Sequence, residues 1–120
     1  MALPSGVSKD SIRALYEVLT GGDGLGIQDQ ILPSGTNRSG SISTGGTAQQ
    51  LAAANATRRG LIGQNISTGD LWINEIGGTA AADTAGSYRV TAGSTFEVST
   101  SRAVSIIGAT TGQKFTASEW

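Results

Sequence analysis

Leu71-Trp72-Ile73-Asn74 and Thr95-Phe96-Glu97-Val98 are the two stretches that decide the fold class. Successive side chains of a strand point to opposite faces of its sheet. One face of each stretch can therefore supply a core, while the other meets solvent or a neighbouring subunit. Turn-forming residues at Asp70, Gly77-Gly78 and Ala92-Gly93 separate the runs. The pattern predicts short strands rather than helices.

The same pattern continues over most of the chain after Thr47, where Gly, Thr and Asp separate short strand-like runs. Seven strands are predicted: Gln49 to Ala53, Arg58 to Asn65, Leu71 to Glu75, Tyr88 to Val90, Ser94 to Ser99, Ala103 to Gly108 and Gln113 to Ala117. Many short strands with frequent turns are typical of an antiparallel sandwich or small barrel. We therefore expect a mostly β, jelly-roll-like domain over residues 47–120.

Trp72 is the aromatic residue with two competing interpretations. Exposed tryptophans are common platforms for sugar rings, and a buried one fills a core. Because Trp72 lies between Leu71 and Ile73, packing in the core or between sheets is favoured over ligand stacking.

The N-terminal residues predict a short helix from about Lys9 to Leu19. Ser8 can cap its first turn, and Gly21-Gly22 can end it. One apolar stripe runs along it at i, i+3, i+4 and i+7: Ile12, Leu15, Tyr16 and Leu19. A helix this short does not persist alone in water, so the stripe must dock on the β core or on another subunit.

Residues 21–46 are rich in Gly, Ser and Asn, and Pro33 interrupts any regular element. Unstructured segments of this length are usually linkers or become ordered against a partner. We therefore divide the chain into a helix and extended arm, residues 1–46, and a β domain, residues 47–120. The residues expected to bind a partner are the helix stripe, the apolar anchors of the arm and the final tryptophan: Ile12, Leu15, Tyr16, Leu19, Ile27, Ile31, Leu32, Ile42 and Trp120.

The composition argues against catalysis, metal binding and nucleic-acid binding. The 120 residues include no His and no Cys, so the commonest general base, metal ligands and thiol nucleophile are missing. Nine acidic residues form no recognisable catalytic pair. The net charge of -1 provides no long-range field for phosphate backbones. We expect no catalytic residues, no cofactor, no metal and no nucleic-acid partner.

The glycine-rich run Gly21-Gly22-Asp23-Gly24-Leu25-Gly26 resembles a phosphate-binding or calcium-repeat loop only superficially. No Lys-Ser or Lys-Thr pair ends it, and a calcium repeat requires Asp where Gly26 stands. We interpret it as a helix cap followed by a hinge.

Arg58-Arg59 is the only basic doublet, and in a strand its two side chains would point to opposite faces. Ordinary surface solvation is the favoured interpretation of both. The alternative is an Arg that forms a bidentate pair with a carboxylate across a subunit boundary.

No stretch approaches the roughly 18 apolar residues of a membrane span, and Met1 to Gly6 lack the features of a signal peptide. We expect a protein that is made and kept in a cytoplasm, without a membrane partner.

One pattern of turn and packing residues resembles small β-rich virion proteins of tailed bacteriophages. It covers roughly Thr47 to Trp120 and consists of these segments: Arg58-Arg59-Gly60-Leu61, Gln64-Asn65, Ser67, Asp70-Leu71-Trp72-Ile73-Asn74, Gly77-Gly78-Thr79-Ala80-Ala81 and Gly108-Ala109-Thr110-Thr111-Gly112-Gln113-Lys114-Phe115. Residues 1–46 carry no such resemblance.

The resemblance implies a virion location, with assembly in the host cytoplasm, and a capsid decoration or cement protein, a head-fibre base or a minor tail component. Such proteins commonly form homotrimers and bind the major capsid protein or other virion proteins. We expect a non-enzymatic cement protein that stabilises the head by ordering its arm across capsid subunits. Two alternatives stay open, a glycan-binding host-attachment module on a fibre and a tail adaptor.

Overall fold

The computed structural model describes residues 35–120. This part of the chain is mostly β, and between residues 35 and 120 it contains nine strands and no helix. The predicted N-terminal helix, the glycine-rich run at residues 21–26 and most of the predicted arm lie outside the described residues. The prediction of a mostly β, antiparallel domain is confirmed.

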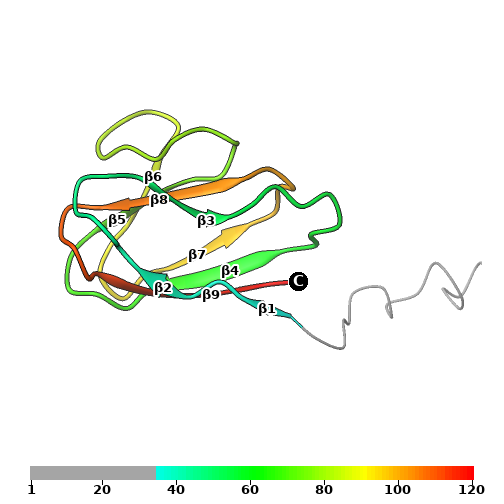
Figure 1. The fold of residues 1–120 in the computed structure, drawn as a ribbon, viewed down its shortest axis with the longest axis horizontal. Coiled ribbons are helices and arrows are strands. Elements are labelled where there is room, and N and C mark those ends of the chain that lie inside the picture. The colour runs from blue at the N-terminus through cyan, green and yellow to red at the C-terminus, as the bar shows by residue number, and fades with distance from the viewer. Residues whose placement is uncertain (1–34) are drawn as a thin grey trace, which may run out of the picture. The chain divides into compact units, whose positions relative to one another are not determined.

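Two antiparallel sheets make up the described part (Figure 1). Sheet A has the order β1-β9-β4-β7, and β2 also pairs with β9. Its strands are β1 (Thr36–Asn37), β2 (Gly40–Ser41), β4 (Leu61–Asn65), β7 (Thr95–Val98) and β9 (Lys114–Glu119). Sheet B has the order β3-β8-β5-β6. Its strands are β3 (Gln49–Ala52), β5 (Leu71–Asn74), β6 (Tyr88–Val90) and β8 (Val104–Gly108).

One hydrophobic core joins the two sheets because both contribute alternate side chains to it. In β9, for example, Phe115 and Ala117 are buried while Thr116 and Ser118 are exposed. The core members come from both sheets and one connecting segment: Ile42, Leu51, Ala52, Leu61, Leu71, Ile73, Val90, Phe96, Val98, Val104, Ile106, Phe115 and Ala117.

Each of the seven predicted strands overlaps an observed strand, and Tyr88–Val90 has the predicted bounds. The largest shift is in β4, which begins at Leu61 instead of Arg58. Before that point the backbone N–H groups of Arg59 and Gly60 both donate to the Trp120 carbonyl, at 2.6 and 3.1 Å. Two donors on one acceptor interrupt the regular ladder of hydrogen bonds, so the strand starts after Gly60, at Leu61.

The predicted boundary between arm and β domain at residues 46 and 47 is corrected by the structure. The compact β unit spans Ser34–Trp120. Strands β1 and β2 pair with β9, and Ile42 is 1% exposed in the core. Two-residue strands are too short to show a periodic pattern, so a Gly- and Ser-rich segment with regular pairing looked like an arm.

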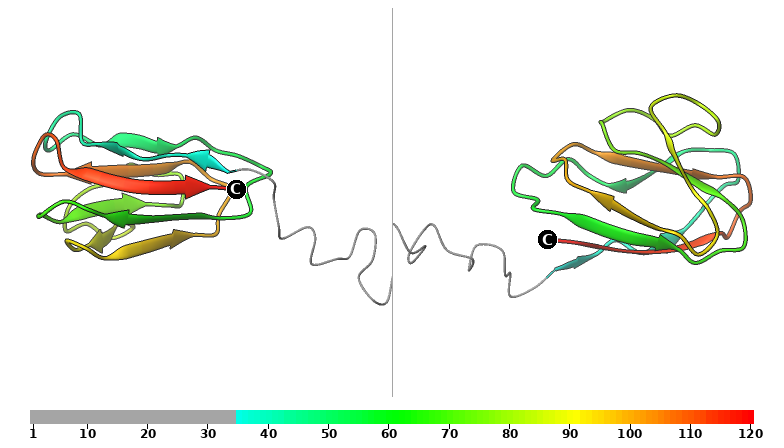
Figure 2. Two further views of the ribbon diagram at one scale, coloured as in Figure 1. Left: turned by 90° about the horizontal axis from the view of Figure 1, so that it is seen from below. Right: turned by 180° about the vertical axis from the view of Figure 1, so that it is seen from behind.

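The strand register gives the β domain two distinct ends. Thr36 pairs with Glu119 at one end, which we call the base end. Ser41 pairs with Lys114 towards the other, the distal end. Figure 2 shows from two further directions that the described chain begins beside the C-terminus. The first described residue, Gly35, therefore lies at the base end.

Candidate functional site

A row of three cross-strand neighbours lies on the outer face of sheet B. Trp72 of β5 pairs with Arg89 of β6 on one side and with Ile107 of β8 on the other. Leu71 and Ile73 on either side of Trp72 are buried in the core, and Trp72 itself is partly exposed. The prediction that Trp72 packs in the core or between the sheets is therefore wrong.

Arg89 holds one side of the indole. Its guanidinium carbon lies 5.8 Å from the centre of the Trp72 ring. A cation in this position is attracted to the aromatic face. Arg89 therefore favours the observed position of the indole.

The segment between β5 and β6, residues 75–87, is fastened to the outer face of sheet B. The Ala80 backbone N–H donates to Ser105 Oγ at 2.9 Å, and Ala80 is 2% exposed. The Ala81 N–H donates to Ser87 Oγ at 3.0 Å, which closes the loop on itself. At the start of the segment, Asn74 Oδ1 accepts two further backbone N–H groups. These bonds hold the loop as a wall above the sheet.

Between this wall, the sheet and the distal turns lies a pocket of about 550 Å³, which we call the Trp72 pocket. Small-ligand sites usually measure ~300–1,000 Å³. It is lined by Gly46, Gly69, Asp70, Trp72, Ala81, Ala82, Asp83, Ile107, Gly108, Ala109, Thr110 and Gln113. Arg89 is not among the lining residues.

Gln113 fixes the distal side of the Trp72 pocket. Its side-chain amide donates to the Asp70 carbonyl at 3.1 Å and to Ser67 Oγ at 3.3 Å. Its Oε1 accepts the Thr110 backbone N–H at 3.0 Å. A Cβ on Gly108 would collide with the Gln113 side chain and crowd Leu71, so a larger residue here would have to displace Gln113. The distal turns are thereby locked to both sheets.

The charged groups of the Trp72 pocket are two carboxylates. Asp70 and Asp83 line it, both are exposed, and neither forms an ion pair within residues 35–120. Asp83 has φ 53°, a left-handed conformation that Asp tolerates better than most residues. No Lys or Arg lines the pocket. The site offers an aromatic and aliphatic surface together with acceptors for hydroxyl groups.

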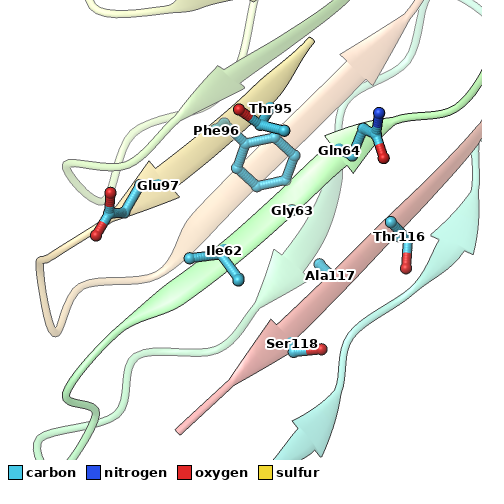
Figure 3. Close-up of a pocket in the computed structure, with 9 residues that line it drawn as sticks. All are labelled: Ile62, Gly63, Gln64, Thr95, Phe96, Glu97, Thr116, Ala117 and Ser118. Carbon is cyan, nitrogen blue, oxygen red and sulfur yellow. The ribbon is translucent and has the colours of Figure 1, made fainter. Parts of the chain in front are cut away.

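A second, shallower hollow of about 550 Å³ lies over sheet A (Figure 3). Its outward-facing side chains come from β4, β7 and β9, and all of them are exposed except the partly buried Gln64: Ile62, Gln64, Thr95, Glu97, Thr116 and Ser118. Below them the Phe96 ring packs over Gly63, where a Cβ would collide with it. Ile62 is 47% exposed at the centre of otherwise polar side chains. This face suits a contact with another protein surface better than a small-molecule site.

The base end contains a polar cluster around the buried side chains of Glu119 and Arg58, the Glu119 cluster, which also includes Arg38 and Asn55. Arg38 Nε donates to Glu119 Oε2 at 3.0 Å, and Asn55 Nδ2 donates to Oε1 at 2.7 Å. Arg58 Nη2 lies 3.7 Å from Oε2. Burial alone would raise the pKa of Glu119, but the bonds from Asn55 and Arg38 and the two positive charges lower it below its ordinary value.

Arg58 is fully buried, so the favoured prediction of surface solvation is wrong for this residue. Its guanidinium donates to the carbonyls of Ala53, Thr100 and Arg102 at 2.6 to 2.8 Å. Its Nε has no partner among the described residues. Arg59, the other half of the doublet, is exposed as expected. Arg58 therefore ties three chain segments together inside one subunit.

Two of the nine residues predicted to bind a partner lie in the described part. Ile42 is a core residue, which removes it from any partner surface of the folded domain. Trp120 exchanges backbone hydrogen bonds with Gly60, and its ring covers that glycine, so it packs on its own domain. The other seven lie outside the described residues: Ile12, Leu15, Tyr16, Leu19, Ile27, Ile31 and Leu32.

The sequence interpretation missed the Trp72 pocket, although one signal for it was present. Leu71 and Ile73 share a sheet face, so Trp72 between them must face the opposite way. No comparable local signal predicts that Asp83 and Gln113 line the Trp72 pocket.

Within residues 35–120 no group of three or more acidic side chains is arranged to hold a metal. The same described residues contain no helix long and apolar enough to cross a membrane. Comparisons with protein-family models, with curated proteins and with solved structures found no match.

Proposed function

We propose that this chain is a non-enzymatic structural component of a bacteriophage virion, and specifically a capsid decoration or cement protein. The observation that carries the proposal is the polarity of the β domain. Its first described residue, Gly35, lies at the base end, beside Glu119 of the C-terminal strand β9. A module tethered at one end can present its outer sheet faces and its distal end away from the surface that holds it.

Several residues of the pattern that resembles phage virion proteins have packing roles in the β domain, and they support this function. Leu61, Leu71 and Ile73 are core side chains, and Asn65 is a fully buried residue that fastens the distal turns. The same residues support a jelly-roll-like sandwich as the finer description of the fold. Such compact sandwiches suit repeated attachment to a shell.

The attachment mechanism that we propose depends on residues 1–34. It does not involve Ile42, because Ile42 is a core residue. The helix stripe and the anchors Ile27, Ile31 and Leu32 would become buried against the major capsid protein or another virion protein. Trimerisation would bring three such segments together and raise their effective concentration at the shell. Stabilisation of the head would then increase with occupancy.

An electron-microscopy reconstruction of the phage particle whose genome encodes this chain tests the proposal. We expect regularly repeated density on the icosahedral shell, with residues 1–34 leading from the base end to the capsid surface. Particles assembled with a chain that lacks residues 1–34 should not show this density. Density confined to the tail or to fibres would contradict the cement function and favour an adaptor or attachment function.

The second candidate function is a fibre-borne, glycan-binding host-attachment module. The specific observation in its favour is the Trp72 pocket, with its oriented indole and its two carboxylates. Location in the particle separates the two candidates, because a cement protein must cover the shell.

A further inference from the structure

We propose that the Trp72 pocket is a binding site for an uncharged saccharide, with one pyranose ring packed on Trp72 and Ile107. This inference rests on the pocket alone and not on the virion function. A head-bound cement protein could carry such a site as well as a fibre module could.

The aromatic wall supports a sugar as ligand. A pyranose ring has an apolar C–H face, which packs on an indole, and a rim of hydroxyls, which need hydrogen-bond partners. Trp72 and Ile107 are cross-strand neighbours, and both line the pocket. Arg89 supports the indole from the β6 side, outside the pocket lining. The apolar side of the site is therefore formed and oriented in advance.

The polar rim selects for hydroxyl groups. Asp70 lies just before β5 and Asp83 in the loop between β5 and β6, and both line the pocket. An ionised carboxylate is an acceptor only, so it pairs with donors such as sugar hydroxyls. Neither carboxylate has an ion-pair partner within residues 35–120. Both can therefore accept hydroxyls without breaking an existing ion pair.

The charge pattern narrows the class of sugar. Two negative charges and no cation in the lining disfavour sialic acids and uronic acids. A quaternary ammonium is the other ligand that an aromatic and acidic site attracts, but such ligands are usually held by a cage of several aromatic rings. Trp72 is the only aromatic side chain in the lining, so the pocket has no such cage. An uncharged hexose or N-acetylhexosamine fits these constraints better.

The walls are rigid enough to favour binding. The loop at residues 75–87 is held by Ser105 and Asn74, and the distal turns are held by Gln113. A ligand that enters a preformed site loses less free energy to ordering of the protein.

The test uses the full chain and the two indole N–H signals that its two tryptophans give in a ¹H–¹⁵N NMR spectrum. Trp72→Phe assigns the signals. Glucose, galactose, mannose, rhamnose and N-acetylglucosamine are titrated to ~50 mM, which covers millimolar dissociation constants. We expect at least one sugar to shift the Trp72 signal while the Trp120 signal stays in place. Glucuronate and tetramethylammonium serve as the charged comparisons.

Variants then locate the binding by ligand-observed NMR. Trp72→Ala should weaken it about tenfold or more, and Asp70→Asn and Asp83→Asn by about threefold each. Tyr88→Ala is the matched control, because Tyr88 is an exposed aromatic of the same sheet and does not line the pocket. The Trp72→Phe variant, which keeps an aromatic face, should retain part of the affinity even if Trp72→Ala unfolds.

Three results would overturn the proposal. The first is the absence of any Trp72 shift with every uncharged sugar tested. The second is stronger binding of tetramethylammonium or glucuronate than of the uncharged sugars. The third is saccharide binding that survives in folded Trp72→Ala, because the ligand would then occupy another surface.

Discussion

At the base end the Glu119 carboxylate is 3% exposed and bonded to Arg38 and Asn55, whereas at the distal end Asp70 and Asp83 are exposed and form no ion pair among residues 35–120. The same type of group therefore has two roles in one small domain. A buried charge must be paired to be tolerated, so the Glu119 cluster serves stability. An exposed, unpaired carboxylate beside an aromatic wall costs little and remains available to a ligand. The comparison teaches that the base end holds the domain together and the distal end can interact.

The largest expected effect comes from breaking the Glu119 cluster. Arg58→Met removes the donors of three carbonyls and one of two positive charges beside Glu119, so it should lower the free energy of unfolding by about 3–5 kcal/mol. Arg59→Met is the matched control, because Arg59 is exposed, and should change stability by less than ~0.5 kcal/mol. Urea denaturation of both variants measures the difference. Equal losses in the two would contradict the assignment of Arg58 as the buried partner.

Ile42 tests whether the segment between β2 and β3 belongs to the core. Ile42→Ala should lower the free energy of unfolding by about 2–4 kcal/mol, because Ile42 is 1% exposed. Ile66→Ala removes the same atoms at a site that is 53% exposed, and its cost should stay near ~0.5 kcal/mol. Thermal unfolding of the two variants provides the measurement. A harmless Ile42→Ala would restore the arm assignment for this segment.

Acid should weaken the base end first. The folded pKa of Glu119 is lowered, so its contribution to stability is complete above the ordinary glutamate pKa of 4.5 and is lost as the pH falls from there through the folded pKa. Glu119→Gln removes this titration. Its free energy of unfolding should therefore fall less steeply below pH 4.5 than that of the unaltered chain. Parallel slopes in urea denaturation between pH 5 and pH 3 would show that Glu119 does not carry the effect.

The smallest expected effect on stability lies in the Trp72 pocket. Trp72 is on an outer face, so Trp72→Ala should cost only about 1 kcal/mol, mostly from lost contact with Arg89 and Ile107. Denaturation of this variant beside Arg58→Met separates a ligand site from a structural one. A loss as large as that of Arg58→Met would assign Trp72 to the architecture of the domain.

The strands were predictable because their signals are local. Alternation in Thr95-Phe96-Glu97-Val98 and turn residues such as Gly93 act within a few positions, and these stretches became β7 and the turn before it. The short strands β1 and β2 gave no such signal. Their pairing depends on β9, which lies far away in the chain.

The candidate site was less predictable than the fold. The orientation of Trp72 follows from its neighbours Leu71 and Ile73, but its surroundings do not. Asp83 reaches the pocket only because the loop at residues 75–87 is bonded back onto sheet B, and Gln113 reaches Asp70 only through the packing of the distal turns.

The sequence by itself determined a mostly β chain with seven recognisable strands, no histidine, no cysteine and a net charge of -1. It could do so because composition and the two-residue period of a strand are local properties. Only the tertiary structure decided that Arg58 is buried beside Glu119, that Ile42 is a core residue and that Trp72 lines a pocket. Each of these depends on register and sheet order, which bring together residues that no local pattern connects.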